Sequence, residues 1–537
     1  MELTISRRGR CRGALVVMLT VALSVIAACA QPTKVAVERS RDLGDLPRPT
    51  ETTTETSTDP STDPSTDPTN ATTPPTGTST DPTTPGSDPT VPPSTAPGAD
   101  VFEEGPDKAE REYDDMVEAT VADLENSWAT FYPEFYGEPY EPLEGGVWPV
   151  YPDRSDRVPG CGTSETSYRD ILAFAAFYCP LGDFIAYDDG DEGIFGQLIE
   201  DLGPSIVPVV IAHEWGHAIQ ARNGTFDSGQ PTIVTEQQAD CFSGAWTARA
   251  RAGDVPGIEF TDTEVQAGMA ALIAVRDPID TSASTPGAHG SGFDRVGAFQ
   301  AGYLNGTGRC TELIDSPLPL VPNEFSEQNA DPADRNPDAP FEDSSPDIKD
   351  GIFTIVAADL NTYWPLVFES TGTPFPVLVV EAAPDPANVG CADLESVEES
   401  AGYCQVDGTV YYDESFMREL YDQFGDFGVG YVLGTAWSDA AQDLLESPFT
   451  DEPRSLLNDC LTGSWVRTIL PDENDETSPT ATARIEPGDL DEAVQTTLLI
   501  GDATADEDIA GTAFEKIDNF RDGALNGLEA CSERIPD

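Results

Sequence analysis

One short segment combines side chains in a spacing that suits metal chemistry. His213-Glu214-Trp215-Gly216-His217 is an H-E-x-x-H sequence inside an apolar stretch. On a helix, this spacing places both imidazoles on one face, where they can bind a single Zn²⁺. Glu214 would then reach the water that the metal activates and act as the general base. Because H-E-x-x-H also recurs by chance, a helix with two surface histidines is the competing interpretation.

Three further observations favour a metal site. The chain has only three histidines, and two of them lie in this segment. Glu236 follows His217 by 19 residues, so its carboxylate could complete the ligand set of His213, His217 and Glu236. Asp240, one helical turn after Glu236, could orient a ligand imidazole. No fourth protein ligand lies close in sequence, which favours one catalytic Zn²⁺ with an open position over a closed structural site.

The elements that position these residues are mostly helical, so the predicted fold class is α+β, mainly helical. Asp183 to Asp188 is predicted to be an edge strand before the site. Asn223-Gly224 should end the helix that carries the two histidines. The predicted helices are Glu110 to Phe131, Ile206 to Arg222, Thr235 to Arg249, Thr261 to about Val275 and Asp294 to Leu304.

The second half of the chain repeats the first in degenerate form, with corresponding features roughly 220 to 240 residues apart. The segment 240–246, which reads DCFSGAW, returns at 459–465 as DCLTGSW. Phe293-x-Arg295 is echoed by Phe514-x-Lys516. We therefore predict a tandem duplication, with domains at 106–315 and 347–537 joined by a linker at 316–346.

The residues capable of chemistry are lost together in the second copy. His213, Glu214, His217, Glu236 and His289 correspond to Thr435, Ala436, Asp439, Ser455 and Ala510, respectively. Scaffold residues persist, because Trp215, Gln220 and Asp240 correspond to Trp437, Gln442 and Asp459. This pattern groups His289 with the metal site, although an exposed loop histidine is its alternative interpretation. It also predicts that the second copy lacks the metal ligands.

Eight cysteines remain after those of the N-terminal segment are set aside, which suggests four disulfides in an exported chain. Each copy contains four of them at corresponding places, so pairing within copies is favoured. Sequence alone leaves other connectivities open. The favoured pairs are Cys161 with Cys179, Cys241 with Cys310, Cys391 with Cys404, and Cys460 with Cys531.

The N-terminus is typical of an export signal. Basic residues precede a short apolar run that ends in Ile26-Ala27-Ala28-Cys29, which is similar to a lipobox. We expect residues 1–28 to be a lipoprotein signal peptide, Cys29 to carry the lipid, and the protein to be an extracytoplasmic cell-membrane lipoprotein. Cleavage at an A-x-A site, which would release a secreted soluble protein, is the alternative. Residues 29–105 are expected to form a disordered tether rich in Thr, Pro, Ser and Asp.

The composition limits the partners. The chain has 97 acidic and 28 basic residues, for a formal net charge of −69. Nucleic acid and anionic membrane surfaces would be repelled, so membrane contact is expected through the lipid anchor alone. Solubility is the simplest explanation of the acidity.

Several segments together resemble the bacterial putative neutral zinc metallopeptidase family over about Glu110 to Cys310. The resemblance implies a zincin-like fold and hydrolysis of a peptide or protein substrate. The set is also similar to gluzincins, which implies that Asp240 holds His213 and that His289, with Arg295, stabilises the oxyanion. The segments are Cys161-Gly162, Phe177 to Pro180, Val210 to Gln220, Glu236 to Cys241, and His289 to Ser291 with Arg295-Val296.

Two other functions compete with an exported zinc metallopeptidase. A non-catalytic cell-surface binding or scaffold lipoprotein would use zinc structurally, and that interpretation is preferred for the second copy alone. A zinc-dependent cell-wall amidase shares the chemistry but has a different ligand pattern.

Overall fold

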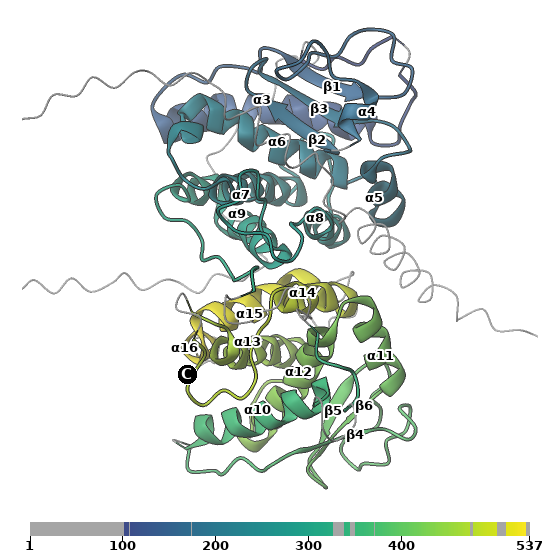
Figure 1. The fold of residues 1–537 in the computed structure, drawn as a ribbon, viewed down its shortest axis with the longest axis vertical. Coiled ribbons are helices and arrows are strands. Elements are labelled where there is room, and N and C mark those ends of the chain that lie inside the picture. Colours follow the sequence, from purple (N-terminus) through teal and green to yellow (C-terminus); the bar gives the residue numbers. More distant parts are fainter. Residues whose placement is uncertain are drawn as a thin grey trace, which may run out of the picture.

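The computed structural model describes residues 101–106, 108–172, 174–325, 338–343, 350–369, 371–472, 476–501 and 512–532. The predicted signal peptide, Cys29 and the tether up to residue 100 lie outside the described residues. Figure 1 shows two lobes, one formed by the first half of the chain and one by the second. Both lobes mix helices with one small sheet, so the α+β class is confirmed.

The first lobe contains a three-stranded sheet in the order β1-β3-β2. β1 (Gly146–Val150) pairs in parallel with β3 (Phe184–Asp188), and β2 (Ala176–Cys179) pairs with β3 in antiparallel orientation. The prediction of an edge strand at Asp183 to Asp188 is therefore wrong, because this strand is central and β2 is at the edge. All five residues of β3 are buried, as expected of a strand covered on both faces.

Helices make up the rest of the first lobe. The helix with the H-E-x-x-H sequence, α6, ends where Gly224 adopts a left-handed conformation that suits glycine. Thr261 and Glu264 form a capping box at the start of α8. The elements are α3 (Asp114–Tyr136), α4 (Tyr168–Ile171), α5 (Ile194–Leu202), α6 (Ile206–Asn223), the 3-10 turn η2 (Thr225–Asp227), α7 (Thr232–Arg251), α8 (Asp262–Ala274) and α9 (Gly292–Glu312).

The second lobe follows a similar order of elements, although its described residues have no equivalent of α4 and η2 and it ends with an additional short helix. Its sheet has the order β4-β6-β5, with β4 and β6 parallel and β5 and β6 antiparallel, as in the first lobe. The elements are α10 (Ile352–Phe368), β4 (Val379–Ala382), β5 (Ala401–Cys404), β6 (Thr409–Tyr412), α11 (Glu414–Gln423), α12 (Asp426–Leu444), α13 (Asp451–Ile469), α14 (Asp489–Ile500), α15 (Ala513–Asn526) and α16 (Leu528–Ser532).

Four disulfides join cysteines within lobes, in the pairing favoured from the sequence. One bond in each lobe lies beside the sheet, and the other joins two helices of the lobe core. They are Cys161–Cys179, Cys241–Cys310, Cys391–Cys404 and Cys460–Cys531.

The two lobes meet through α8 and α9 on one side and α14 and α15 on the other (Figure 1). The rings of Phe293 and Phe520 pack edge to face across this boundary, with centroids 6.4 Å apart, and both are fully buried. The side chain of Gln300 donates a hydrogen bond of 2.9 Å to the carbonyl oxygen of Phe514. One apolar core therefore continues from lobe to lobe.

Among the described residues, no helix is both long enough and apolar enough to span a membrane.

Candidate metal centre

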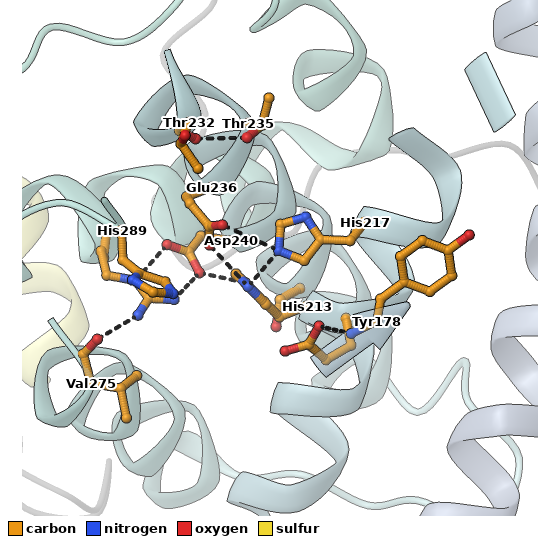
Figure 2. A network of polar contacts seen from close by, with 12 residues as sticks. Tyr178, His213, His217, Thr232, Thr235, Glu236, Asp240, Val275 and His289 are labelled. Carbon is orange, nitrogen blue, oxygen red and sulfur yellow. Dashed lines mark hydrogen bonds and ion pairs between the residues drawn. The ribbon is translucent and has the colours of Figure 1, made fainter. Parts of the chain in front are cut away.

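Three side chains from two helices converge at one point. His213 and His217 lie on α6, and Glu236 lies on α7, which packs against it. The Nε2 atoms of the histidines are 3.2 Å apart. Glu236 Oε2 lies 3.4 Å from His213 Nε2, and Glu236 Oε1 lies 3.5 Å from His217 Nε2. Figure 2 shows the three side chains turned toward one another.

These separations fit a single zinc ion. Bonds of 2.0 to 2.1 Å in a tetrahedral arrangement place two zinc ligands about 3.3 Å apart, which is close to all three distances. Two imidazoles and one carboxylate are donors that zinc accepts. Glu236 Oε2 is buried and has no hydrogen-bond donor among the described residues, so this oxygen is available to a cation.

The electrostatics of the site also favour a cation. Burial raises the pKa of Glu236. The interactions with His217, His289 and His213 lower it by more, so the pKa lies well below its usual value. Burial lowers the pKa of His213, yet Asp240 and Glu236 raise it to about 10. The carboxylates thus draw positive charge into the site, and a bound metal would replace the protons.

Asp240 holds His213 in position. Its Oδ1 lies 2.7 Å from His213 Nδ1, so Nδ1 carries the proton and Nε2 presents its lone pair to the centre. Asp240 is fully buried, and Arg295 donates to both of its oxygens from Nε (2.9 Å) and Nη2 (2.8 Å). Burial raises the pKa of Asp240, but the interactions with Arg295 and His213 lower it by a larger amount. The net pKa is below its usual value, so the carboxylate stays ionised.

Gln220 supports His217 in the same way, a role that the sequence pattern had not indicated. Gln220 Oε1 lies 2.8 Å from His217 Nδ1, which leaves His217 Nε2 free for a metal. The orientation of the amide is set because its Nε2 donates to the carbonyl oxygen of Thr235 (2.6 Å) and to Gln238 (3.1 Å). The available signal was the position of Gln220, three residues after His217 and almost one helical turn away.

Glu214 is held beside the edge strand. The backbone N–H of Tyr178 in β2 donates a hydrogen bond of 2.7 Å to Glu214 Oε2. Glu214 is buried, and its neighbour His213 is one of the three converging residues. This contact fixes the carboxylate between the sheet and the metal site.

His289 is partly exposed in the structure, whereas Arg295 is buried. The imidazole of His289 is 35% exposed, with Nδ1 3.6 Å from Asp277 Oδ1. Asp277 Oδ2 accepts hydrogen bonds from the backbone N–H groups of His289 (2.8 Å) and Gly290 (2.7 Å), so Asp277 shapes this loop. The guanidinium of Arg295 is buried and bound to Asp240 and to the carbonyl oxygen of Val275 (3.1 Å). This arrangement favours a positioning role for Arg295 over direct contact with an oxyanion.

The second lobe has polar contacts at the positions that the predicted duplication aligns with this site. Lys516 donates to the buried Asp459 at 2.8 Å, which corresponds to the contact of Arg295 with Asp240. The hydroxyl of Tyr431 donates to the other oxygen of Asp459 at 2.6 Å. Asp439, which the predicted duplication aligns with His217, forms an ion pair of 2.7 Å with Arg454. All three histidines of the chain belong to the first lobe.

Comparison with known proteins agrees with this centre. Residues 89–312 match the model of a family described as "Putative neutral zinc metallopeptidase", so the family similarity covers the first lobe. The chain is 31% identical over 169 residues to the uncharacterized proteins Rv2575 and MT2651 of Mycobacterium tuberculosis and Mb2605 of Mycobacterium bovis. Each match covers 27% of this chain and 55% of the relative, so the chain spans about half the length of these curated relatives. No solved structure matches.

Proposed function

We propose that the first lobe is a zinc-dependent peptidase with Glu214 as its general base. The observation that carries this proposal is the convergence of His213, His217 and Glu236 at 3.2 to 3.5 Å. Bound zinc would polarise the scissile carbonyl and make the attacking water more acidic. Glu214 removes the proton from that water and later delivers it to the leaving amine.

The supporting residues keep this machinery aligned. Asp240 and Gln220 hold the two imidazoles, and Arg295 neutralises the buried Asp240. His289, on the loop shaped by Asp277, stabilises the oxyanion of the tetrahedral intermediate. β2 lies at the edge of the sheet beside Glu214, and an extended peptide could pair with the backbone groups of this strand that Glu214 does not bind.

We infer that the second lobe is a degenerate copy of the first, without catalytic function. The common strand order, the corresponding disulfides and the matching Asp459–Lys516 pair support this inference. Its packing on α8 and α9 suits a scaffold that supports the catalytic lobe.

We also propose that the protein acts outside the cytoplasm, anchored through a lipid on Cys29. Four disulfides support this location, because such bonds persist in oxidising compartments. The partner is then a peptide or protein substrate, with no nucleic acid involved.

The decisive experiment compares residues 101–537 with the Glu214→Ala variant on an unfolded protein substrate, with zinc measured on the same samples. Glu214 is not a metal ligand, so the variant should retain about one zinc and lose at least about 10²-fold in turnover. His217→Ala should lose the zinc, whereas Asp439→Ala, at the corresponding position of the second lobe, should keep zinc and activity. Equal cleavage by wild type and Glu214→Ala would refute the mechanism. Zinc in both without any cleavage would favour the binding-scaffold alternative.

A further inference from the structure

A second group of acidic side chains lies in the second lobe, where two helices begin. Asp426 is the first residue of α12, and Asp489 and Glu492 lie in the first turn of α14. Asp338 approaches them from the segment before α10. Asp426, Asp489 and Glu492 are only 5%, 4% and 5% exposed. We call these four residues the carboxylate cluster.

The oxygens of the cluster are close enough to share one ion. One oxygen each from Asp338, Asp426 and Glu492 lies within 4.8 Å of the others. The opening turn of α12 is shaped around the cluster, because Gly425 has φ 128° and a Cβ there would overlap the Glu492 carboxylate. Asp489 is the fourth carboxylate of this group, because the charges of Asp426 and Glu492 both raise its pKa.

Three of these carboxylates have no cationic partner among the described residues. No ion pair with Lys, Arg or His in that part of the chain involves Asp426, Asp489 or Glu492. Backbone N–H groups bind one oxygen each of Asp426 (2.6 Å, from Ala339), Glu492 (2.7 Å, from Phe427) and Asp489 (2.9 Å, from Glu486).

The other oxygens of the aspartates point to a missing ligand. Oδ1 of Asp426 and Oδ1 of Asp489 are buried without a hydrogen-bond donor among the described residues. Burial and, to a smaller extent, the neighbouring charge of Asp338 raise the pKa of Asp426 to about 7. Burial and the neighbouring carboxylates also raise the pKa values of Asp489 and Glu492. Buried carboxylates without partners are unfavourable, so a cation that binds them would stabilise the fold.

We propose that the carboxylate cluster is a Ca²⁺ site. A site made only of oxygen donors suits a hard cation and differs from the histidine-containing zinc centre. Mg²⁺ usually keeps several waters and binds through one or two carboxylates, whereas Ca²⁺ takes about six to eight oxygen ligands in a flexible geometry. A buried group of carboxylates within 4.8 Å of one another therefore suits Ca²⁺, with water completing its coordination.

The position of the site connects the cation to the catalytic lobe. Asp491 lies between Asp489 and Glu492 on α14 and faces the other lobe, and Figure 1 shows α14 at the boundary. Its carboxylate accepts a hydrogen bond from the backbone N–H of Phe293 (2.8 Å) and pairs with Arg276 (2.9 Å). Phe293 is the second residue of α9, which follows directly after the loop that carries His289. A cation that fixes the first turn of α14 therefore also steadies the start of α9.

The test uses the zinc-loaded protein in calcium-free buffer, with Ca²⁺ added back and the zinc content followed throughout. At a Ca²⁺ concentration about 100-fold above the dissociation constant, the Tm of the two-lobed unit should rise by about 2 to 4 °C. Tb³⁺, a probe for Ca²⁺, should show luminescence sensitised by Tyr421, whose hydroxyl binds Ala339 beside the cluster (2.9 Å). Neither readout requires peptidase activity, so failure here is distinct from failure of the proposed function.

Two variants complete the design. Asp426→Asn with Glu492→Gln removes two buried charges, so the variant should be at least as stable as wild type without Ca²⁺ and should lose the response to Ca²⁺ and Tb³⁺. Glu419→Gln, at an exposed position on the neighbouring α11, should keep the full response. A full response in the double variant, or none in wild type, would overturn the site. An equal response to the same concentration of Mg²⁺ would overturn its assignment to Ca²⁺.

Discussion

The residues that contact the proposed metal ligands orient the two imidazoles of the candidate zinc centre. His213 is oriented by a buried carboxylate, and His217 is oriented by an amide that is itself fixed by two further acceptors. Such hydrogen bonds select the imidazole tautomer and increase the basicity of the metal-binding nitrogen. A similar buried pair joins Asp459 and Lys516, which the predicted duplication aligns with Asp240 and Arg295, in the lobe that contains no histidine. The buried pair therefore serves the helix packing as well as the metal.

This comparison separates the two roles. Asp240→Asn should weaken zinc binding by about 10- to 100-fold, because the amide no longer balances Arg295 or strengthens His213 as a ligand. Zinc competition against a chromogenic chelator measures the change. Asp459→Asn is the matched control, which should cost stability while leaving zinc affinity unchanged. Equal zinc affinity in the wild type and Asp240→Asn would contradict the assigned role.

At the scale of elements, reciprocal glycine contacts bring α7 and α9 together. A Cβ on Gly244 would overlap the carbonyl oxygen of Phe299, and one on Gly302 would overlap that of Cys241. In the second lobe, α13 and α15 approach through Gly463 and Gly523 in the same manner. Because α7 carries Glu236 and Asp240 and α9 carries Arg295, this close approach sets the distance between the ligand helix and its supporting residue.

Substitution at this contact should reverse the usual effect of alanine in a helix. Gly→Ala in a helix normally stabilises by about 1 kcal/mol, but Gly244→Ala would force the two helices apart and should destabilise by about 1 to 3 kcal/mol. Denaturant unfolding gives the difference. Gly308→Ala on α9, where the new methyl group would make ordinary contact with Phe135, is the control and should be neutral or mildly stabilising. A stabilised Gly244→Ala protein would argue against the close packing.

At the scale of the whole molecule, the lobes share a core, so they should not unfold independently. Phe293 and Phe520 meet across the boundary, and Arg521 lies over the Phe293 ring and donates to its carbonyl oxygen. The boundary involves corresponding helices of each lobe, much like a two-fold interface within one chain.

Cavities on and off the boundary test this coupling. Phe520→Ala should cost about 3 to 5 kcal/mol and should also accelerate hydrogen exchange in α9 of the first lobe. Phe368→Ala makes a similar cavity at the far end of α10, where the ring packs on Trp364 and Phe375, and should affect α9 much less. Hydrogen exchange measured by mass spectrometry distinguishes the two variants. Similar acceleration of α9 in both variants would mean that the boundary has no special part in the coupling.

The sequence by itself indicated the candidate metal chemistry and most of the helices. The spacing of His213 and His217 is a local property of one helix that needs no tertiary knowledge, whereas Glu236 joins them only because α7 packs against α6. The predicted helices occur, although α3 begins four residues later and extends five residues further, and α9 continues for eight residues beyond Leu304. The internal comparison between halves of the chain also indicated which cysteines would pair, because it supplied a second example of the same spacing.

Only the tertiary structure decided the contacts that join distant segments. Strand order depends on pairing across the chain, so β3 is central although its sequence resembled an edge strand. The fixed positions of Glu214 against Tyr178, and of Arg295 against Asp240, depend on where a strand and two helices meet. The carboxylate cluster brings together residues more than 140 positions apart. In a chain with 97 acidic residues, charge alone could not single them out, because burial and proximity appear only after folding.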